Sequence, residues 1–349
     1  MYNDIPLWLS IIFLVGGLYL VAKSADLFVD SASTVATALG INPFIVGMVV
    51  IGFGTSAPEL CVSALSGLSG HSDVSLGNAY GSCSFNIALI LGVAVIIRPI
   101  TVRKASSVII ASTVLVLITL FSCLLVGCGN GFSRMDGVME LGVFILLLPL
   151  YCWYDQRVRG EEGRVKSEEL GGKKEEGTGN RVGLKGKGDR GMGVGKASLI
   201  LLVGLAGLVG ASHVLVWGAV DAARAMGVSE LLIGLTIIAV GTSLPELASA
   251  VASARKGEHE FVMGNIIGSN IFNTLGVVGL AGTISPFKNV SPYILTRDLP
   301  TLVLFSVSIA IFGLNLKDIR QPGRIGRTKG IIWLAMFAVY LGVMLWQEC

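Results

Sequence analysis

The chain has 349 residues, of which 53% are apolar and only 14% are charged, and its mean hydropathy is +0.76. This composition excludes an ordinary soluble domain and indicates a polytopic membrane protein that lies in the lipid bilayer. The formal net charge of +3 says little by itself, because in membrane proteins the placement of Lys and Arg matters more than their sum. We expect no nucleic-acid partner and no obligatory protein partner.

Apolar runs long enough to cross roughly 30 Å of hydrocarbon predict an all-α membrane protein with about ten transmembrane helices. The first run is expected to be retained, since "MYNDIPLWLS" lacks the basic region and cleavage site of a signal peptide. Spans one and six should continue as long, partly polar helices, because the residues after them keep helical spacing. The predicted spans are 6–24, 44–68, 74–97, 106–127, 137–155, 197–223, 231–254, 261–284, 299–316 and 329–346.

A hydrophilic, Gly-rich segment of mixed charge, residues 156–196, separates the fifth span from the sixth. It has almost no large apolar residues to bury, so we interpret it as a flexible linker between two units, 1–155 and 197–349. With the N-terminus outside, the loops that fall inside hold 21 of the 26 Lys and Arg residues. This bias predicts a multi-pass protein of the cell membrane with both chain termini outside and the linker in the cytoplasm.

Two motifs recur at an offset of 187 residues. "GTSAPEL" (54–60) matches "GTSLPEL" (241–247), and "GNAYGSCSFN" (77–86) matches "GNIIGSNIFN" (264–273), within the wider regions 52–92 and 239–279. Each half contains five predicted spans, an odd number, so the second half enters the membrane from the opposite side. The sequence thus predicts two inverted-topology five-helix repeats, an arrangement typical of secondary transporters.

The first motif places a helix breaker, hydroxyls and a carboxylate inside an apolar span. Pro58 has no N–H and its ring clashes with the preceding turn, so the carbonyls of Gly54 and Thr55 lose their helical partners. Such backbone is tolerated at membrane depth only where it faces protein, water or a bound ion. Ser56 and Glu59 lie on the same side of this bent helix. Ala239, Gly241, Thr242, Ser243, Pro245 and Glu246 repeat the arrangement in the second half.

The second motif adds the amides of Asn78 and Asn86 and the hydroxyl of Ser82 at four-residue spacing, with glycines that allow close helix packing. Six cysteines show no metal spacing and are interpreted as packing residues. Oxygen ligands without a histidine or thiolate cluster favour hard cations such as Ca²⁺ or Na⁺. Two glutamates balance one Ca²⁺, two Na⁺ or two protons, so the charge count leaves the exchanged ions open.

Single hydroxyls in a span are usually packing residues, whereas an intramembrane glutamate is functional by default. Asp26, Asp30 and His213, the last at the position that matches Asp26, either line an ion path or lie near helix ends. We favour the second interpretation for these three residues.

The doubled motifs resemble the two α-repeats of the sodium/calcium exchanger family, a branch of the Ca²⁺/cation antiporter superfamily. The resemblance covers nearly the whole chain and is closest to members without a Ca²⁺-sensing domain. It implies ion sites in the middle of spans 2, 3, 7 and 8, and a sliding of the long first and sixth helices that switches access. The ligands it implies are Thr55, Ser56, Glu59, Ser82, Asn86, Thr242, Ser243, Glu246, Ser269 and Asn273.

Two positions depart from the family pattern. Several members, including potassium-dependent exchangers, carry Asp where this chain has Asn273. Cys83 stands where the second repeat has Asn270, and a thiol is a poor ligand for a hard ion. These departures leave the counter-ion open.

The leading hypothesis is a secondary active antiporter, not an enzyme, that exchanges Ca²⁺ for Na⁺ by alternating access without a cofactor or catalytic residue. A Ca²⁺/H⁺ antiporter or a K⁺-coupled variant is the nearest alternative. More distant ones are an intramembrane protease with a carboxylate dyad, and a passive channel.

Overall fold

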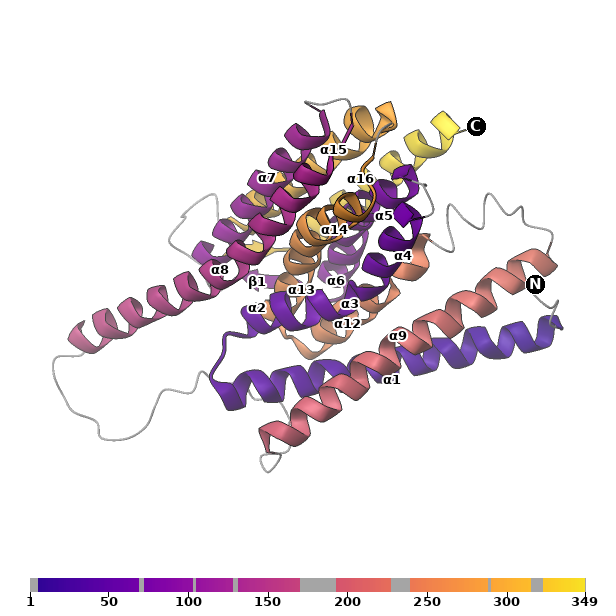
Figure 1. Ribbon diagram of the computed structural model, residues 1–349. Helices are drawn as coiled ribbons and strands as arrows, with labels where there is room; N and C mark the ends of the chain where they lie inside the picture. Colours follow the sequence, from indigo (N-terminus) through magenta and orange to yellow (C-terminus); the bar gives the residue numbers. More distant parts are fainter. Residues whose placement is uncertain are drawn as a thin grey trace.

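The computed structural model describes residues 6–68, 72–102, 105–127, 131–169, 193–226, 239–287, 290–314 and 323–348. These residues are almost entirely helical (Figure 1). Seven of the helices are long and apolar enough to cross a membrane, or eight if one bent pair forms a single span. The prediction of a helical, polytopic membrane protein is therefore confirmed at this level.

The helical segments follow one another along the chain with few interruptions. In the first part they are α1 (Leu7–Leu39), α2 (Pro43–Val46), the π-helical η1 (Gly47–Gly52), α3 (Phe53–Thr55), α4 (Ala57–Leu68), α5 (Ser72–Phe85), the π-helical η2 (Asn86–Leu91), α6 (Gly92–Ile97), α7 (Ala105–Gly127) and α8 (Arg134–Glu169). In the second part they are α9 (Val194–Ala225), α11 (Ala239–Thr242), α12 (Leu244–Lys256), α13 (His259–Ile271), the π-helical η4 (Phe272–Val277), α14 (Val278–Ile284), the π-helical η5 (Ile294–Asp298), α15 (Leu299–Gly313) and α16 (Arg327–Glu348). Strands β1 (Ile100–Val102) and β2 (Gly323–Ile325) pair antiparallel, with Ile100 opposite Ile325.

The fifth predicted span and the linker end at other residues than predicted, and parts of the linker and of the seventh span lie outside the described residues. The span predicted at 137–155 lies within α8, which continues to Glu169 into the segment predicted as a flexible linker. Residues 156–169 are rich in Glu, Arg and Lys, which favour helix even where nothing apolar is buried. The rest of that linker up to 192, and residues 231–238 of the seventh predicted span, lie outside the described residues.

The long helices α1 and α9 pack antiparallel along one side of the molecule (Figure 1). Their length confirms the prediction that spans one and six continue as long helices. A Cβ on Gly17 would lie 2.9 Å from the Leu215 backbone, and one on Gly204 would lie 2.9 Å from the Phe28 backbone nitrogen. Each contact maps onto the other by the 187-residue offset, so the two helices meet through equivalent surfaces.

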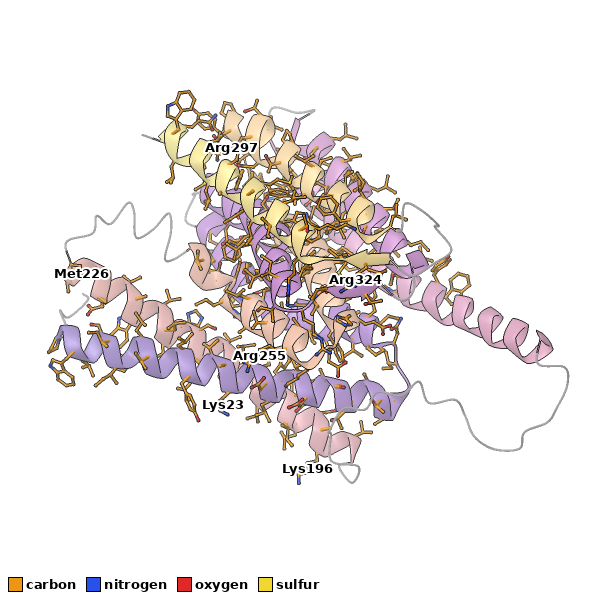
Figure 2. All side chains as sticks on the ribbon, turned by 180° about the vertical axis from the view of Figure 1, so that it is seen from behind. Lys23, Lys196, Met226, Arg255, Arg297 and Arg324 are labelled. Atoms are coloured by element: carbon orange, nitrogen blue, oxygen red, sulfur yellow. The ribbon has the colours of Figure 1, made fainter. Side chains whose placement is uncertain are left out.

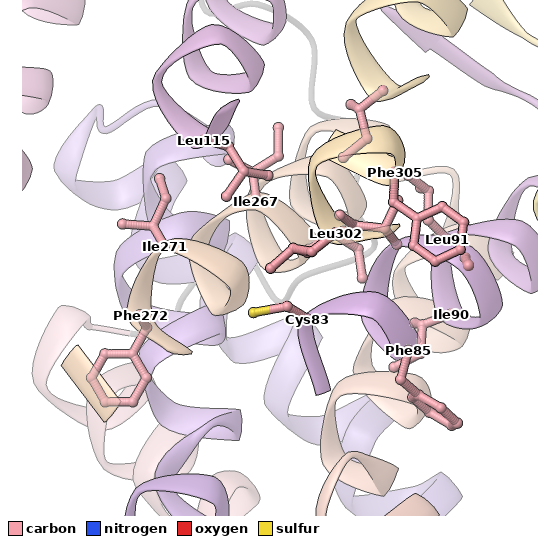
Figure 3. Packing of buried hydrophobic residues seen from close by; sticks show 14 of the residues in the cluster. Cys83, Phe85, Ile90, Leu91, Leu115, Ile267, Ile271, Phe272, Leu302 and Phe305 are labelled. Carbon is pink, nitrogen blue, oxygen red and sulfur yellow. The ribbon is translucent and has the colours of Figure 1, made fainter. Parts of the chain in front are cut away.

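The remaining helices form a bundle whose core is a single apolar cluster (Figure 3). Phe305 and Leu302 of α15, Ile267 of α13 and Leu115 of α7 all lie in it. Arg297 and Arg324 lie toward opposite ends of the α15–α16 pair (Figure 2). These two basic residues therefore lie at the ends of the bundle, away from its apolar core.

Helix α13 lies directly against η1 because glycines line the contact. A Cβ on Gly264 would lie 2.3 Å from the carbonyl oxygen of Phe44, and one on Gly268 would lie 2.3 Å from that of Met48. Real side chains do not approach backbone so closely, so only glycine fits at either position. This contact fixes the distance between the polar stretches of the two halves of the chain.

We predict that Gly268→Ala destabilises the protein by about 1–3 kcal/mol, because the added methyl must push the two backbones apart. Gly142→Ala in α8 is the matched control, since a Cβ there meets nothing within 4 Å. Thermal unfolding of the detergent-purified proteins measures both. Equal stability of the two variants would contradict the close contact.

Candidate cation-binding site

The two Pro-Glu motifs interrupt their helices at equivalent residues. Ser56 has φ −84° and ψ 7°, and Ser243 has φ −91° and ψ 9°. Each stands between a short helix, α3 or α11, and the helix that carries the proline, α4 or α12. In the first half, the segments on either side are bent by 41°. The break expected from Pro58 and its copy is therefore present in both halves, one residue before the new helix begins.

The carboxylates of Glu59 and Glu246 lie at these breaks, and each is held by a serine of the other half. Ser56 Oγ donates to Glu246 Oε1 at 2.8 Å, and Ser243 Oγ donates to Glu59 Oε1 at 3.0 Å. Both glutamates have 0% exposed surface. The crossed hydrogen bonds bring two buried carboxylates into one site, built equally from both halves of the chain.

Further hydroxyls surround the two carboxylates. Ser243 Oγ also lies 3.4 Å from Ser82 Oγ of α5. Thr242 is half-buried beside the Glu59 carboxylate, and the side chain of Thr55 lies beside that of Glu246. The Thr55 hydroxyl donates to the Ile51 carbonyl at 2.9 Å, so it is oriented by its own helix.

Asn78 and Asn265 brace the two broken helices in parallel ways. Asn78 Nδ2 donates to the Glu59 carbonyl at 3.2 Å and to Ser63 Oγ at 2.9 Å. Asn265 Nδ2 donates to the Glu246 carbonyl at 3.4 Å and to Ser249 Oγ at 2.9 Å. These amides fix the backbone from which each carboxylate projects.

Ser269 belongs to the same polar layer. Its hydroxyl donates to the Gly52 carbonyl at 3.3 Å, across the glycine contact between α13 and η1. Gly52 is four residues before the break at Ser56. The hydroxyl therefore joins the two halves close to the carboxylates.

Asn86 and Asn273 are fully buried in the π-helical segments η2 and η4. Among the described residues, neither amide has a hydrogen-bond partner for its nitrogen or its oxygen, and Oε2 of Glu59 and of Glu246 also has none. Buried polar atoms are almost always paired, so this set calls for a ligand that takes several oxygens at once. Single π-helical turns are frequent at functional sites.

The donor chemistry of the site suits a hard cation. It offers carboxylate, hydroxyl and amide oxygens, and the residues that the structure describes contain no cluster of three or more His, Cys, Asp or Glu residues. The salt bridges seen among these residues involve Lys256 and Arg297 and leave Glu59 and Glu246 without a basic partner. Two negative charges in such surroundings require cations or protons to balance them.

Cys83 lies at the edge of this region, packed among apolar side chains (Figure 3). Its sulfur is 3.6 Å from Thr274 Oγ1 and 3.7 Å from the Asn270 carbonyl oxygen. A buried free cysteine behaves as a small apolar side chain, so Cys83 acts as a packing residue.

Asp26 and Asp30 of α1 lie at the surface and pair with Lys256 at the end of α12. Lys256 Nζ lies 3.5 Å from Asp26 Oδ1 and 3.0 Å from Asp30 Oδ1. His213 on α9 is exposed. Glu258 lies just before α13, and its burial, together with the negative charges of Glu260 and Asp30, raises its pKa. Asp26 and Asp30 lie well inside α1 and His213 lies well inside α9, so the prediction that they lie near helix ends is wrong. The ion pairs and the exposure of His213 indicate helix-surface residues rather than ion ligands.

The sequence interpretation missed the fully buried carboxylate of Glu140 in α8 and the bracing roles of Ser63 and Ser249. The signal for Glu140 was present, because a glutamate inside an apolar span is functional by default. The two serines gave no such signal, since their partners lie on another helix.

Comparison with known proteins agrees with this geometry. The family model described as "Sodium/calcium exchanger protein" matches residues 9–153 and 196–346. The chain therefore belongs to the sodium/calcium exchanger protein family.

Several relatives match over almost their whole length. The chain is 36% identical over 339 residues to the inner membrane protein YrbG of Escherichia coli (97% of each chain), and 36% identical over 329 residues to the putative antiporter CaxA of Alkalimonas amylolytica (94% of this chain, 96% of the relative). It is 28% identical over 356 residues to the sodium/calcium exchanger MaX1 of Methanosarcina acetivorans (96% and 98%). Among solved structures it is similar to the sodium-calcium exchanger NCX_Mj soaked with Na⁺ and Sr²⁺, with a TM-score of 0.76, 28% identity and coverage of 97% and 99%.

We predict that Ser56→Ala and Ser243→Ala each weaken Ca²⁺ binding by a similar factor, because each removes the hydroxyl that holds one carboxylate. A hydrogen bond to a charged group contributes about 1.5–3 kcal/mol, which is roughly ten- to a hundredfold in affinity. Isothermal titration of the purified protein measures the effect. Ser306→Ala, a buried serine of α15 whose Oγ has no partner, is the control and should bind like the unmodified protein.

We also predict that Asp26→Asn and Asp30→Asn change Ca²⁺ affinity by less than about twofold, because exposed ion pairs contribute about 1 kcal/mol or less to stability and touch no site oxygen. The same titration decides. A loss of binding as large as that of the serine variants would show that these carboxylates line the ion path.

Proposed function

We propose that the protein is a secondary active antiporter that exchanges Ca²⁺ for Na⁺ across the cell membrane by alternating access. The observation that carries this proposal is the crossed pairing of Ser56 with Glu246 and of Ser243 with Glu59. It places two buried carboxylates in one site whose charge is balanced equally by one Ca²⁺ or by two monovalent cations. A site that binds either one Ca²⁺ or two monovalent cations, but not both at once, couples the movement of one ion to that of the other.

The proposed ligands come from both halves of the chain. The carboxylates supply charge, the two amides with unpartnered atoms supply neutral oxygens, and the hydroxyls complete the set. The set is Thr55, Ser56, Glu59, Ser82 and Asn86 with Thr242, Ser243, Glu246, Ser269 and Asn273. Membership of the exchanger family supports this assignment.

We further propose the finer architecture of ten transmembrane helices in two inverted five-helix repeats, 1–155 and 197–349, with both chain termini outside. Reciprocal contacts support it, because the Ser56–Glu246 pair maps onto Ser243–Glu59 by the 187-residue offset. An internal two-fold relation between the halves generates such reciprocal pairs. The excess of Lys and Arg in the same set of loops supports a cytoplasmic position for the linker 156–196.

A Ca²⁺/H⁺ antiporter, or one that also moves K⁺, is the alternative that the site chemistry allows. Protons neutralise two buried carboxylates as well as Na⁺ does. The neutral Asn273 lowers the negative charge of the site relative to an aspartate there. The relative named as a sodium/calcium exchanger favours Na⁺.

Transport in proteoliposomes tests the proposal. An outward Na⁺ gradient should drive uptake of radioactive Ca²⁺, and Glu59→Gln or Glu246→Gln should abolish it because the remaining charge no longer balances a divalent ion. Glu260→Gln, which neutralises a carboxylate in the first turn of α13 outside the site, should leave uptake in place.

The counter-ion is decided in the same vesicles. Uptake driven by a pH gradient but not by Na⁺ would replace the proposal by Ca²⁺/H⁺ exchange. Flux without any counter-ion gradient would indicate a channel. Persistent uptake in both glutamine variants would refute the site.

A further inference from the structure

A second buried polar cluster lies in the bundle, on helices α8, α7 and α5. Ser122 Oγ donates to Glu140 Oε1 at 2.6 Å, and the Tyr80 hydroxyl lies 2.6 Å from Ser122 Oγ. Glu140 and Ser122 have 0% exposed surface, as does Tyr80. Oε2 of Glu140 has no hydrogen-bond partner in the part of the chain that the structure describes. The cluster thus holds two hydroxyls and one carboxylate, and one oxygen of that carboxylate is unpaired.

This cluster is separate from the candidate cation site. Tyr80 and Ser82 are two residues apart on α5, which turns their side chains about 200° apart around the helix axis. Ser82 contacts Ser243 of the cation site, whereas Tyr80 contacts Ser122 of α7. Glu140 belongs to a helix that supplies none of the proposed ligands.

The described residues around Glu140 supply no balancing positive charge. Within the described part of the chain, no Lys or Arg forms an ion pair with it, and the charged group that acts on it is Asp136, a carboxylate one turn earlier on α8. The helix packed on α8, α14, and the segment η4 contain no titratable side chain. From α5 and α7 the titratable groups near the cluster are Tyr80, Cys83 and Cys123. A buried carboxylate in these surroundings carries a large desolvation cost unless it is neutralised.

We propose that Glu140, with Ser122 and Tyr80, forms a second site that binds one exchangeable proton. The proton adds to Oε2 and converts the carboxylate to a neutral carboxylic acid, while Ser122 continues to donate to Oε1. The number of oxygens favours a proton over a metal ion. A cation such as Ca²⁺ needs six or more oxygens, whereas this cluster offers only the oxygens of three side chains. Both of its hydroxyls already form hydrogen bonds within the cluster.

The proton has a short route to the cluster from the end of α8. Ser133 and Asp136 form a capping box, in which the Ser133 N–H donates to Asp136 Oδ2 at 2.7 Å and the Asp136 N–H donates to Ser133 Oγ at 3.2 Å. Ser133 is exposed and Asp136 is half-buried. Asp136 precedes Glu140 by four residues on the same helix face, so it lies between solvent and the buried acid.

The bound proton has a structural consequence for α8. Where Glu140 lies, α8 is packed tightly on α14, since a Cβ on Gly279 would lie 3.1 Å from Glu140 Cβ and one on Gly137 would lie 2.6 Å from the Thr283 nitrogen. Because the two helices are in such close contact beside Glu140, we expect hydration of a charge there to separate them. The neutral form of Glu140 therefore holds α8 on the bundle, and loss of the proton loosens it.

Infrared difference spectroscopy of the purified full-length protein between mildly acidic and alkaline pH tests the proposal, without any transport assay. The unmodified protein should lose a carboxylic-acid C=O band on alkalinisation, and Glu140→Gln should lack this band. Ser122→Ala should shift it, because the donor to Oε1 is gone. Ser112→Ala, another buried serine of α7, should leave it in place. Thermal unfolding should show a fall in melting temperature at alkaline pH that is smaller in Glu140→Gln.

Three results would overturn the proposal. The Glu140 band could persist through the alkaline range, which would mean a permanently protonated, structural acid. It could be absent at acidic pH, which would mean a stable carboxylate. It could vanish on addition of Na⁺ at constant acidic pH, which would make the cluster a metal-ion site. Because none of these readouts involves Ca²⁺ flux, failure here leaves the antiporter proposal untouched.

Discussion

The structure depends on one constraint, which is the burial of two carboxylates, one from each half of the chain, in the same apolar bundle. Each is stabilised by a hydroxyl that the other half supplies, Ser56 for Glu246 and Ser243 for Glu59. Neither half can satisfy its own carboxylate in this way. Docking of the halves and formation of the site are therefore the same event, and whatever brings the halves together also builds the site.

Two local features follow from that constraint. The helices must break where the serines and glutamates project, and a proline two residues after each break ensures it. The backbones must also approach closely, which the glycines of α13 and η1 allow: at Gly264 and Gly268 any side chain would overlap the carbonyl oxygen of the facing segment. Proline and glycine, both unfavourable inside ordinary helices, are here the residues that the geometry requires.

Much of this could be predicted from the sequence because the information is repeated in it. The polar faces and the long first and sixth helices follow from local helical spacing. The recurrence of the motifs at an offset of 187 residues makes a chance match improbable and identifies the two halves. The crossed pairing could not be predicted, because spacing tells which residues share a face of one helix but not which helix that face meets. The same limit explains the braces: Asn78 bonds Ser63, whereas Asn265 bonds Ser249, which is offset by one residue from the copy of Ser63. The continuation of α8 to Glu169 was missed for another reason, since residues 156–169 are rich in charged helix formers and the predicted spans were sought as apolar runs.

The two kinds of buried carboxylate differ in the number of oxygens around them, and that number determines what each can bind. Glu59 and Glu246 stand together, with amides whose atoms lack protein partners and with hydroxyls from four helical segments, so a multivalent ion can replace its hydration shell there. Glu140 stands alone with two hydroxyls that already bond within the cluster, so only a ligand that needs a single oxygen fits. Both sites face the same desolvation cost of a buried charge. At Glu59 and Glu246 the buried charge is balanced by cations that can exchange. At Glu140 it is neutralised by a proton, which keeps α8 packed on the bundle. Charge alone does not distinguish the two sites, whereas the count of free oxygens does.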